Sequence, residues 1–346
     1  MAPADLKPLT PLLLAAALGA CSDALDQNTV AGQVVAVLNA GSRTLTLVDA
    51  VRFEATSWAL APGVPAGLDA RGSRLAIALG DSDLVQAATP LGPGPVIRLA
   101  RGADPVAVAI QDDSIAWVAN SGLNTVSRIN LTSGDTASFA VGVHPQGVLL
   151  VNSSLLYVLN GNLSGGVPAG PSSISWRNLG NGAGGSGTIV LTGTNARSAV
   201  LGEDGLVYVV AAGSPGAGDG RLAIVDPAAN REVAVLNGLG ESPGPAAYHP
   251  SGRLLIASSS EGILEVNTST RSLVRGPGQG VKPGGEGVAA VLVDPRGRVW
   301  AASPRSCNGP GTVYVLRAPP DYGEIEALVV GVCPVAAALA TVPPVP

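Results

Sequence analysis

A unit of about 40 residues repeats along this chain, and the repeat limits the possible folds more than any other feature of the sequence. Three successive units open with a proline and small residues: Pro65-Ala66-Gly67-Leu68, Pro105-Val106-Ala107-Val108 and Pro145-Gln146-Gly147-Val148. A repeat of this length that holds several short strands is typical of β-propellers, in which each unit forms one blade around a common axis.

Each unit continues with two more apolar segments of strand length. The segment after the small residues has the pattern of a buried strand, as in IAWVAN (115–120) and LLYVLN (155–160). The next segment ends in Asp or Asn, and its copies are TLTLVD (44–49), NTVSRIN (124–130), SISWRN (173–178), RLAIVD (221–226) and GILEVN (262–267). A short Asp or Asn side chain accepts a hydrogen bond from the backbone two residues ahead, so we expect a turn after each copy. The 46 Gly and 28 Pro of the 346 residues supply the frequent turns that such a fold needs.

The number of units predicts a closed ring of seven blades. Six complete units lie near residues 63–100, 102–141, 142–191, 193–239, 240–279 and 280–330. Residues 34–61 form a unit without its first strand, whereas GVCPVAAALATV (331–342) has the sequence of a first strand alone. We therefore predict an all-β, seven-bladed β-propeller with four-stranded antiparallel blades, forming a single domain over residues 34–343. The N- and C-terminal strands would share one blade, which leaves no free sheet edge at the seam.

Residue size along the unit fits this arrangement. The first strand of each blade lies at the crowded axis, where only Gly, Ala and modest β-branched side chains fit. The second strand lies further out and has room for aromatic side chains. We expect Trp117, Tyr157, Tyr208 and Trp300 to pack between neighbouring blades.

The N-terminal segment has the features of a bacterial signal peptide. Lys7 precedes an apolar run from Leu12 to Leu18 that is too short to span a bilayer. Leu18-Gly19-Ala20-Cys21 resembles a lipobox, in which small residues precede a Cys that is acylated and becomes the new N-terminus. We expect residues 1–20 to be a lipoprotein-type signal peptide, Cys21 the lipidated residue and residues 21–33 a polar tether. The protein would then be exported, held to a bacterial membrane by its lipid only, and would face the periplasm or cell surface. A signal peptide without lipidation is the alternative.

Two further cysteines, Cys307 and Cys333, remain in the exported chain. Two thiols in an exported protein favour a disulfide. Cys307 is expected between the second and third strands of the last blade, and Cys333 just before the closing strand. These connections emerge on the same face of a propeller, so we predict a Cys307–Cys333 bond across the seam. Two free buried thiols are the alternative.

One unit resembles a known family. The residues Trp117-Val118-Ala119-Asn120, Asn124-Thr125-Val126 and Ser133-Gly134, followed by VGVHPQGVLLVNSSLLYVLN, are similar to the YVTN-type, YncE-like β-propeller repeat of exported bacterial and archaeal surface proteins. The resemblance implies a seven-bladed fold and a location in the cell envelope. It implies no single chemistry, because similar propellers serve as lactonases, as domains of redox enzymes and as binding proteins.

The sequence contains no catalytic motif in its proper context. Gly240-Glu241-Ser242-Pro243-Gly244 has the spacing of a nucleophile elbow, but a first strand follows it where the elbow needs a helix. The glycines of 182–187 have the spacing of a dinucleotide-binding loop but also precede a strand. The two histidines, His144 and His249, are expected at opposite faces, where they cannot share a metal ion. We therefore predict no catalytic residue and no cofactor. The net charge of −5, without a basic cluster, also argues against nucleic-acid binding.

Polar and charged residues cluster where the first strands begin, near one mouth of the axial channel. They are Asp104, His144, Asn195, Arg197 and Glu286. Propellers commonly bind ligands at this mouth because every blade contributes a loop to it. We therefore take these five residues as the candidate binding site.

Two hypotheses for the function follow. The first is a binding or assembly module, anchored in the cell envelope, for an envelope protein or a small ligand. The alternative is a lactonase-like hydrolase, in which Glu286 resembles the axial Glu of calcium-dependent lactonase propellers and helps to hold Ca²⁺. The absence of a catalytic motif makes an enzyme the less favoured of the two.

The anchor is directly testable. Replacing Cys21 with Ser should abolish incorporation of labelled palmitate in a bacterial host and release the protein from the membrane fraction, because the acylated thiol is lost. Cys333→Ser is the matched control and should keep the label. Equal labelling of the Cys21→Ser variant and the wild type would contradict lipidation at this residue.

Overall fold

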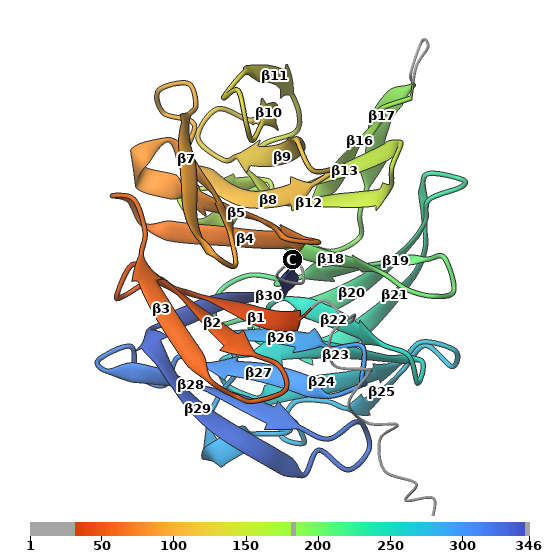
Figure 1. Cartoon of the computed structure of the whole chain (residues 1–346). Helices are drawn as coiled ribbons and strands as arrows, with labels where there is room; N and C mark the ends of the chain where they lie inside the picture. Colours follow the sequence, from red (N-terminus) through yellow and green to blue (C-terminus); the bar gives the residue numbers. More distant parts are fainter. Residues whose placement is uncertain (1–31, 181–184, 343–346) are drawn as a thin grey trace, which may run out of the picture.

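The computed structural model describes residues 32–180 and 185–342. These residues form seven four-stranded antiparallel sheets, and the innermost strands contact one another in a complete ring (Figure 1). The protein is thus an all-β, seven-bladed β-propeller, as the repeat predicts. Within the described residues there is no α-helix, only two short 3-10 turns at Gly80–Ser82 and Pro283–Gly285.

The blades follow one another along the chain, and we number them from 1 to 7. From the axis outward, blade 1 contains β30 (Pro334–Val342), β1 (Gly32–Asn39), β2 (Thr44–Asp49) and β3 (Ala55–Ala59). Blade 2 contains β4 (Pro65–Arg71), β5 (Arg74–Leu79), β6 (Leu84–Thr89) and β7 (Gly92–Arg98). Blade 3 contains β8 (Pro105–Ile110), β9 (Ile115–Asn120), β10 (Thr125–Asn130) and β11 (Thr136–Ala140). Blade 4 contains β12 (Pro145–Asn152), β13 (Leu155–Asn160), β16 (Ser173–Asn178) and β17 (Ser186–Val190).

The remaining blades have the same order. Blade 5 contains β18 (Ala196–Leu201), β19 (Val207–Ala211), β20 (Gly220–Asp226) and β21 (Arg231–Gly240). Blade 6 contains β22 (Ala246–His249), β23 (Arg253–Ser258), β24 (Gly262–Asn267) and β25 (Ser272–Arg275). Blade 7 contains β26 (Ala290–Val293), β27 (Val299–Ser303), β28 (Pro310–Leu316) and β29 (Glu324–Val332). A small hairpin of β14 (Leu163–Ser164) and β15 (Val167–Pro168) lies between β13 and β16 and was not expected from the sequence.

The ring closes through pairing of the last strand with the first. β30 runs antiparallel to β1 over the whole length of β1, from the Gly32–Val342 pair to the Asn39–Pro334 pair, with one irregularity at Leu38 (Figure 1). The alanines of β30 lie at the axis, so small side chains again occupy the innermost position. This pairing completes blade 1, as predicted from residues 34–61 and 331–342.

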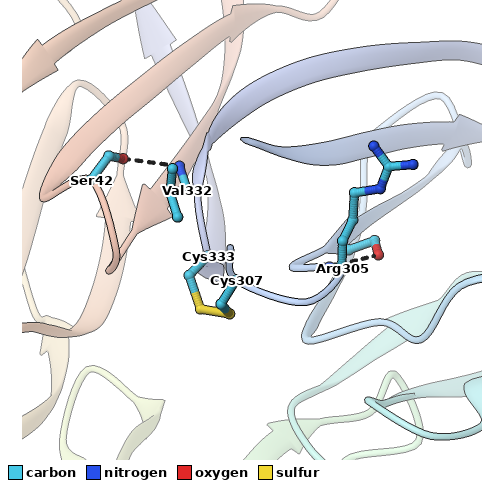
Figure 2. Close-up of a disulfide and its surroundings, with 6 residues drawn as sticks. Ser42, Arg305, Cys307, Val332 and Cys333 are labelled. Carbon is cyan, nitrogen blue, oxygen red and sulfur yellow. Dashed lines mark hydrogen bonds between the residues drawn. A yellow bond between two sulfur atoms is a disulfide. The ribbon is translucent and has the colours of Figure 1, made fainter. Parts of the chain in front are cut away.

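The turn after β1 is hydrogen-bonded to the chain segment that precedes β30. The backbone N–H of Ala40 donates to the carbonyl of Cys333 (2.9 Å), and that of Gly41 donates to Val332 (3.0 Å). The Val332 N–H in turn donates to the Ser42 hydroxyl (3.0 Å; Figure 2). A Cβ atom on Gly41 would lie only 2.7 Å from a methyl carbon of Val332, so this close approach requires glycine.

The predicted disulfide lies at the same seam. Cys307, in the connection from β27 to β28, is bonded to Cys333, which lies between β29 and β30 (Figure 2). The bond therefore attaches blade 7 to the strand that closes blade 1. Closing a loop of this size is expected to stabilise the folded state by roughly 3 kcal/mol.

Side chains at the ends of the third strands form the turns that the sequence predicts. The carboxylate or amide oxygen of Asp49, Asn130, Asn178, Asp226 and Asn267 accepts a hydrogen bond from the backbone N–H two residues ahead, at 2.8–3.0 Å. The repeated Asp or Asn thus has a local structural role in five blades.

Buried asparagines at the end of the second strand tie together the strands of three blades. The Asn120 amide donates to the hydroxyls of Thr125 (2.9 Å) and Ser127 (2.7 Å) on the neighbouring strand. Asn39 makes the equivalent bond to Thr46 (2.9 Å), and Asn160 makes it to Ser175 (3.0 Å). All three asparagines are at most 1% exposed. Asn120 and Thr125, two of the residues that carry the family resemblance in blade 3, therefore have a structural role.

Neighbouring blades are held together by aromatic and polar contacts. Trp117, Tyr157, Tyr208 and Trp300 are all buried, as predicted for side chains between blades. The Tyr157 hydroxyl of blade 4 donates to Asn230 of blade 5 (2.8 Å). At the seam, the Arg298 guanidinium pairs with the buried Asp294 carboxylate (2.7 Å) and donates to the carbonyl of Ala50 in blade 1 (2.6 Å). Hydrogen bonds thus join neighbouring blades alongside the apolar contacts.

The register of the innermost strands differs from the sequence alignment in two later blades. In blade 4, Pro145 pairs with Asn160, whereas in blade 5 it is Ala196 that pairs with Ala211. Arg197 consequently occupies the position of Gln146, one residue further along the strand than the sequence suggested. In blade 7, β26 begins at Ala290, well after Glu286. Neither strand has the proline that marks this position in blades 2 to 4.

Candidate binding site at the axial channel

The seven innermost strands surround a channel with a volume of about 640 Å³. Its wall is formed mainly by small residues of these strands, such as Ala66, Val106, Ala289 and Val335. Because such side chains do not reach the axis, the centre of the ring stays open. We call the face at which the innermost strands begin the mouth face, and the opposite one the far face.

Three of the five predicted mouth residues share an unusual backbone conformation. Asp104, His144 and Asn195 have φ angles of 49°, 53° and 58°, and each immediately precedes an innermost strand. Cys333 has the same conformation before β30, with φ of 57°. Asn, Asp and His tolerate this left-handed region better than most residues do. The geometry of the turn toward the axis therefore accounts for the residue types at three of these positions.

Hydrogen bonds between blades fix these turns. The Asp83 carboxylate of blade 2 accepts hydrogen bonds from the backbone N–H groups of Gly102 (2.8 Å) and Asp104 (3.0 Å) at the start of blade 3. In the same way, the Asn124 side chain of blade 3 accepts a bond from the N–H of His144 (2.8 Å). Asp104 itself accepts a bond from the Ser121 hydroxyl (2.6 Å). The mouth is thus rigidly built in blades 2 to 4.

A polar group spans blades 4 and 5 next to the channel. Gln146 lines the channel, and its side-chain amide donates to the Asn195 carbonyl oxygen (2.6 Å). The Asn195 amide nitrogen donates to the backbone carbonyl of Gly213 (3.1 Å). Arg197 lies at the equivalent position of the next blade and also lines the channel. Asn195 and Arg197 were predicted from the sequence, but Gln146 was not.

Arg197 is the one charged residue among the described residues that line the channel. Its side chain is exposed to the solvent in the channel. Partial desolvation by the channel wall lowers the pKa of the Arg197 guanidinium, although an arginine remains protonated at neutral pH. No ion pair or side-chain hydrogen bond joins it to another described residue. The channel therefore contains an uncompensated positive charge.

Glu286 has a different environment. Its carboxylate pairs with the Arg305 guanidinium (3.2 Å) and accepts a long hydrogen bond from the Ser303 hydroxyl (3.4 Å). Glu286 does not line the channel, and within residues 32–180 and 185–342 no group of three His, Cys, Asp or Glu residues could hold a metal ion. The structure therefore brings Asn195 close to Gln146 and Arg197, and leaves Glu286 paired with Arg305.

The remaining motifs have structural explanations. Ser242 lies in the connection from β21 to β22, with φ of 47° and no helix after it. His249 is buried on the far face, where its ring nitrogens contact the Ser251 hydroxyl (2.7 Å) and the Gly297 carbonyl (3.0 Å). Cys21 and part of the glycine-rich segment 182–187 lie outside the described residues.

Apolar side chains are exposed on the mouth face. Val64 and Val143 precede innermost strands, Leu123 lies in the turn between β9 and β10, and Val167 lies in the β14–β15 hairpin. Backbone bonds from Gly80 to Val64 and from Asn162 to Val143 join these segments to the same face. Blades 2 to 4 thus expose four apolar side chains on the mouth face.

Asp69 is a titratable residue that sequence reasoning missed. It lies in β4, beyond the channel-lining Leu68, and its carboxylate accepts a hydrogen bond from the N–H of Ile110 in blade 3 (2.7 Å). Burial raises the pKa of Asp69 to about 6, against the lowering effect of its backbone hydrogen bonds. An Asp between the apolar residues Leu68 and Ala70 of the first strand was the available signal.

Comparison with known proteins supports the fold alone. No protein family and no curated protein matches the sequence. Among solved structures, hydrazine synthase from Kuenenia stuttgartiensis is similar, with a TM-score of 0.62 and 14% identity over 79% of this chain and 89% of that one. Virginiamycin B lyase from Staphylococcus aureus is similar with a TM-score of 0.58 and 12% identity, over 76% and 85% of the two chains.

In the described part of this chain, no helix has the length and apolar character needed to cross a membrane.

Asp69 should make stability depend on pH in an unusual direction. Because its pKa is higher in the folded state than the ordinary 3.8, folding favours the protonated form, and its contribution should be lost as pH rises from about 4 to about 6. Asp69→Asn keeps an acceptor for Ile110 and removes the titration. Its free energy of unfolding relative to the wild type should rise by about 1 kcal/mol between pH 4 and pH 7.5, a modest value because the carboxyl is partly solvated.

Denaturant unfolding at the two pH values measures this difference. Asp81 is the control, because hydrogen bonds from the Val64 N–H and the Ser82 hydroxyl lower its pKa. Because a carboxyl with a lowered pKa stays ionised over this range, Asp81→Asn should leave the stability difference from the wild type nearly the same at the two pH values. A stability difference between Asp69→Asn and the wild type that does not vary with pH would contradict the assignment.

Proposed function

We propose that this protein is an exported, lipid-anchored β-propeller that acts as a binding module in the bacterial cell envelope and engages its partner through the mouth face. The observation that carries the proposal is the combination found on this face. An unpaired Arg197 cation lies in the channel, and four apolar side chains are exposed on the same face in blades 2 to 4. Exposed apolar side chains that gather on one face are typical of an interaction surface.

The cellular location rests on three features. The Leu18-to-Cys21 segment has the spacing of a lipobox, and the preceding apolar run has the length of a signal peptide. The Cys307–Cys333 disulfide is typical of a protein that folds outside the cytoplasm. The similarity of residues 117–134 to the YVTN-type, YncE-like repeat agrees with an envelope protein. A lipid on Cys21 would hold the propeller at the membrane without a spanning helix.

The geometry supports binding better than hydrolysis. A lactonase-like mechanism would use Glu286 as a calcium ligand, but Arg305 already pairs with this carboxylate. The two similar structures named above carry different activities on the same fold, so the fold does not select a reaction. The binding function is therefore argued from the residues of the mouth face alone.

Site-specific crosslinking tests the proposed face. A photo-reactive residue in place of Leu123 or Val143 should give a discrete adduct with an envelope protein in intact cells of the native host. The same residue in place of Leu91 is the matched control, because Leu91 is an exposed leucine in the turn between β6 and β7 on the far face. Gel mobility and mass spectrometry identify the adducts. The same set of adducts from both faces, or none from the mouth face, would contradict the proposal.

A further inference from the structure

We propose that the axial channel is a binding site for a small organic monocarboxylate, whose carboxylate group is held by the Arg197 guanidinium. This inference rests on the proposed binding function, because it assigns a ligand class to the same face.

Arg197 makes no ion pair or side-chain hydrogen bond with another described residue that would explain its presence by folding. The residues at the same position in other blades include Ala66, Val106, Gly244 and Val335, which are neutral and small. The channel wall partly desolvates this cation, which lowers the pKa of Arg197, and no acidic side chain of the lining compensates its charge. An anion in the channel would supply the missing partner. Arginine is well suited to this task, because its planar fork binds a carboxylate through two parallel hydrogen bonds.

Neutral donors lie beside this cation. Gln146 uses one N–H of its amide for Asn195, so the second N–H remains available. The Ser198 hydroxyl lines the channel and accepts a hydrogen bond from the N–H of Ala246 (3.3 Å), which leaves its own proton free to donate. A cation with adjacent neutral donors is the arrangement that proteins use for carboxylates.

The charge balance selects one negative charge. No acidic side chain is among the described residues that line the channel. At the mouth, Arg305 neutralises the Glu286 carboxylate, and the Asp104 carboxylate accepts a hydrogen bond from the Ser121 hydroxyl. One arginine neutralises one charge, so the second charge of a phosphate or sulfate would have no cationic partner among the described lining residues. This disfavours cations and compact dianions, and favours a monocarboxylate.

The channel also has room for the rest of the molecule. Its volume of about 640 Å³ lies within the range of small-molecule sites, roughly 300–1,000 Å³. Short apolar side chains, such as those of Val106, Ala289 and Val335, line the same channel. A ligand with a carboxylate and a compact apolar body would fill it better than acetate.

Benzoate is a suitable probe, and benzamide is its neutral counterpart of nearly the same shape. Isothermal titration of the purified mature protein at low salt should show binding of one benzoate per chain. Benzamide should bind at least tenfold more weakly, because it lacks the charge that Arg197 recognises. Inorganic phosphate should not compete with benzoate at equal concentration.

Two variants connect the binding to the residue. Arg197→Gln should weaken benzoate binding at least tenfold, whereas Arg296→Gln, which removes an exposed arginine of the far face, should leave it unchanged. Equal melting temperatures would show that both variants fold. Benzoate binding that is absent, unaffected by Arg197→Gln, matched by benzamide or displaced by phosphate would overturn the inference.

This titration uses purified protein and no partner. Its failure would leave the crosslinking result untouched, and an absent adduct would leave the titration untouched. Failure of the ligand assignment can thus be distinguished from failure of the proposed partner-binding function.

Discussion

Pairing of β30 with β1 is the interaction on which the rest of the structure depends. An open stack of seven sheets would leave blade 1 without its innermost strand and would expose a strand edge to solvent. The antiparallel ladder from Gly32–Val342 to Asn39–Pro334 removes that edge and sets the spacing of every blade around the axis. The Cys307–Cys333 bond and the Arg298–Ala50 hydrogen bond add covalent and polar connections at the same seam. Closure therefore links the two ends of the described chain into one rigid ring.

The rigid ring in turn creates the channel and determines what can occupy it. Small side chains at the axis let seven strands converge, and they leave an opening that the fold does not fill. Arg197 is the one charged residue among the described residues of this wall, and no acidic side chain of the lining neutralises its positive charge. The mouth turns of blades 3 and 4 are held by Asp83 and Asn124, so the surface around this charge is preorganised. Preorganisation of this kind suits binding, because little conformational entropy is lost when a ligand arrives.

Most of the fold could be predicted from the sequence, because each repeat of about 40 residues corresponds to one blade. The blade number, the shared first blade, the Asp and Asn turns and the buried aromatics each follow from a local pattern or from chain order. The register of β18 and β26 could not be predicted in the same way, since no proline marks where these strands begin. The β14–β15 hairpin lies within a glycine-rich insertion that has no strand pattern. For the site, Arg197 and Asn195 could be predicted because they are polar residues at a strand of small ones. Gln146 and Asp69 could not, because their roles depend on hydrogen bonds to residues of other blades.

Hydrogen–deuterium exchange of β1 and β30 tests the central claim most directly, because amide protection reports whether these strands are paired. The structure predicts that the amides from Val34 to Leu38, and the alternate amides of β30 that donate to β1, exchange as slowly as those of the central strand β9, whose six residues are all buried. Exchange of the β30 amides at the rate of an unpaired chain, with β9 protected, would show that the ring is open and would contradict this account.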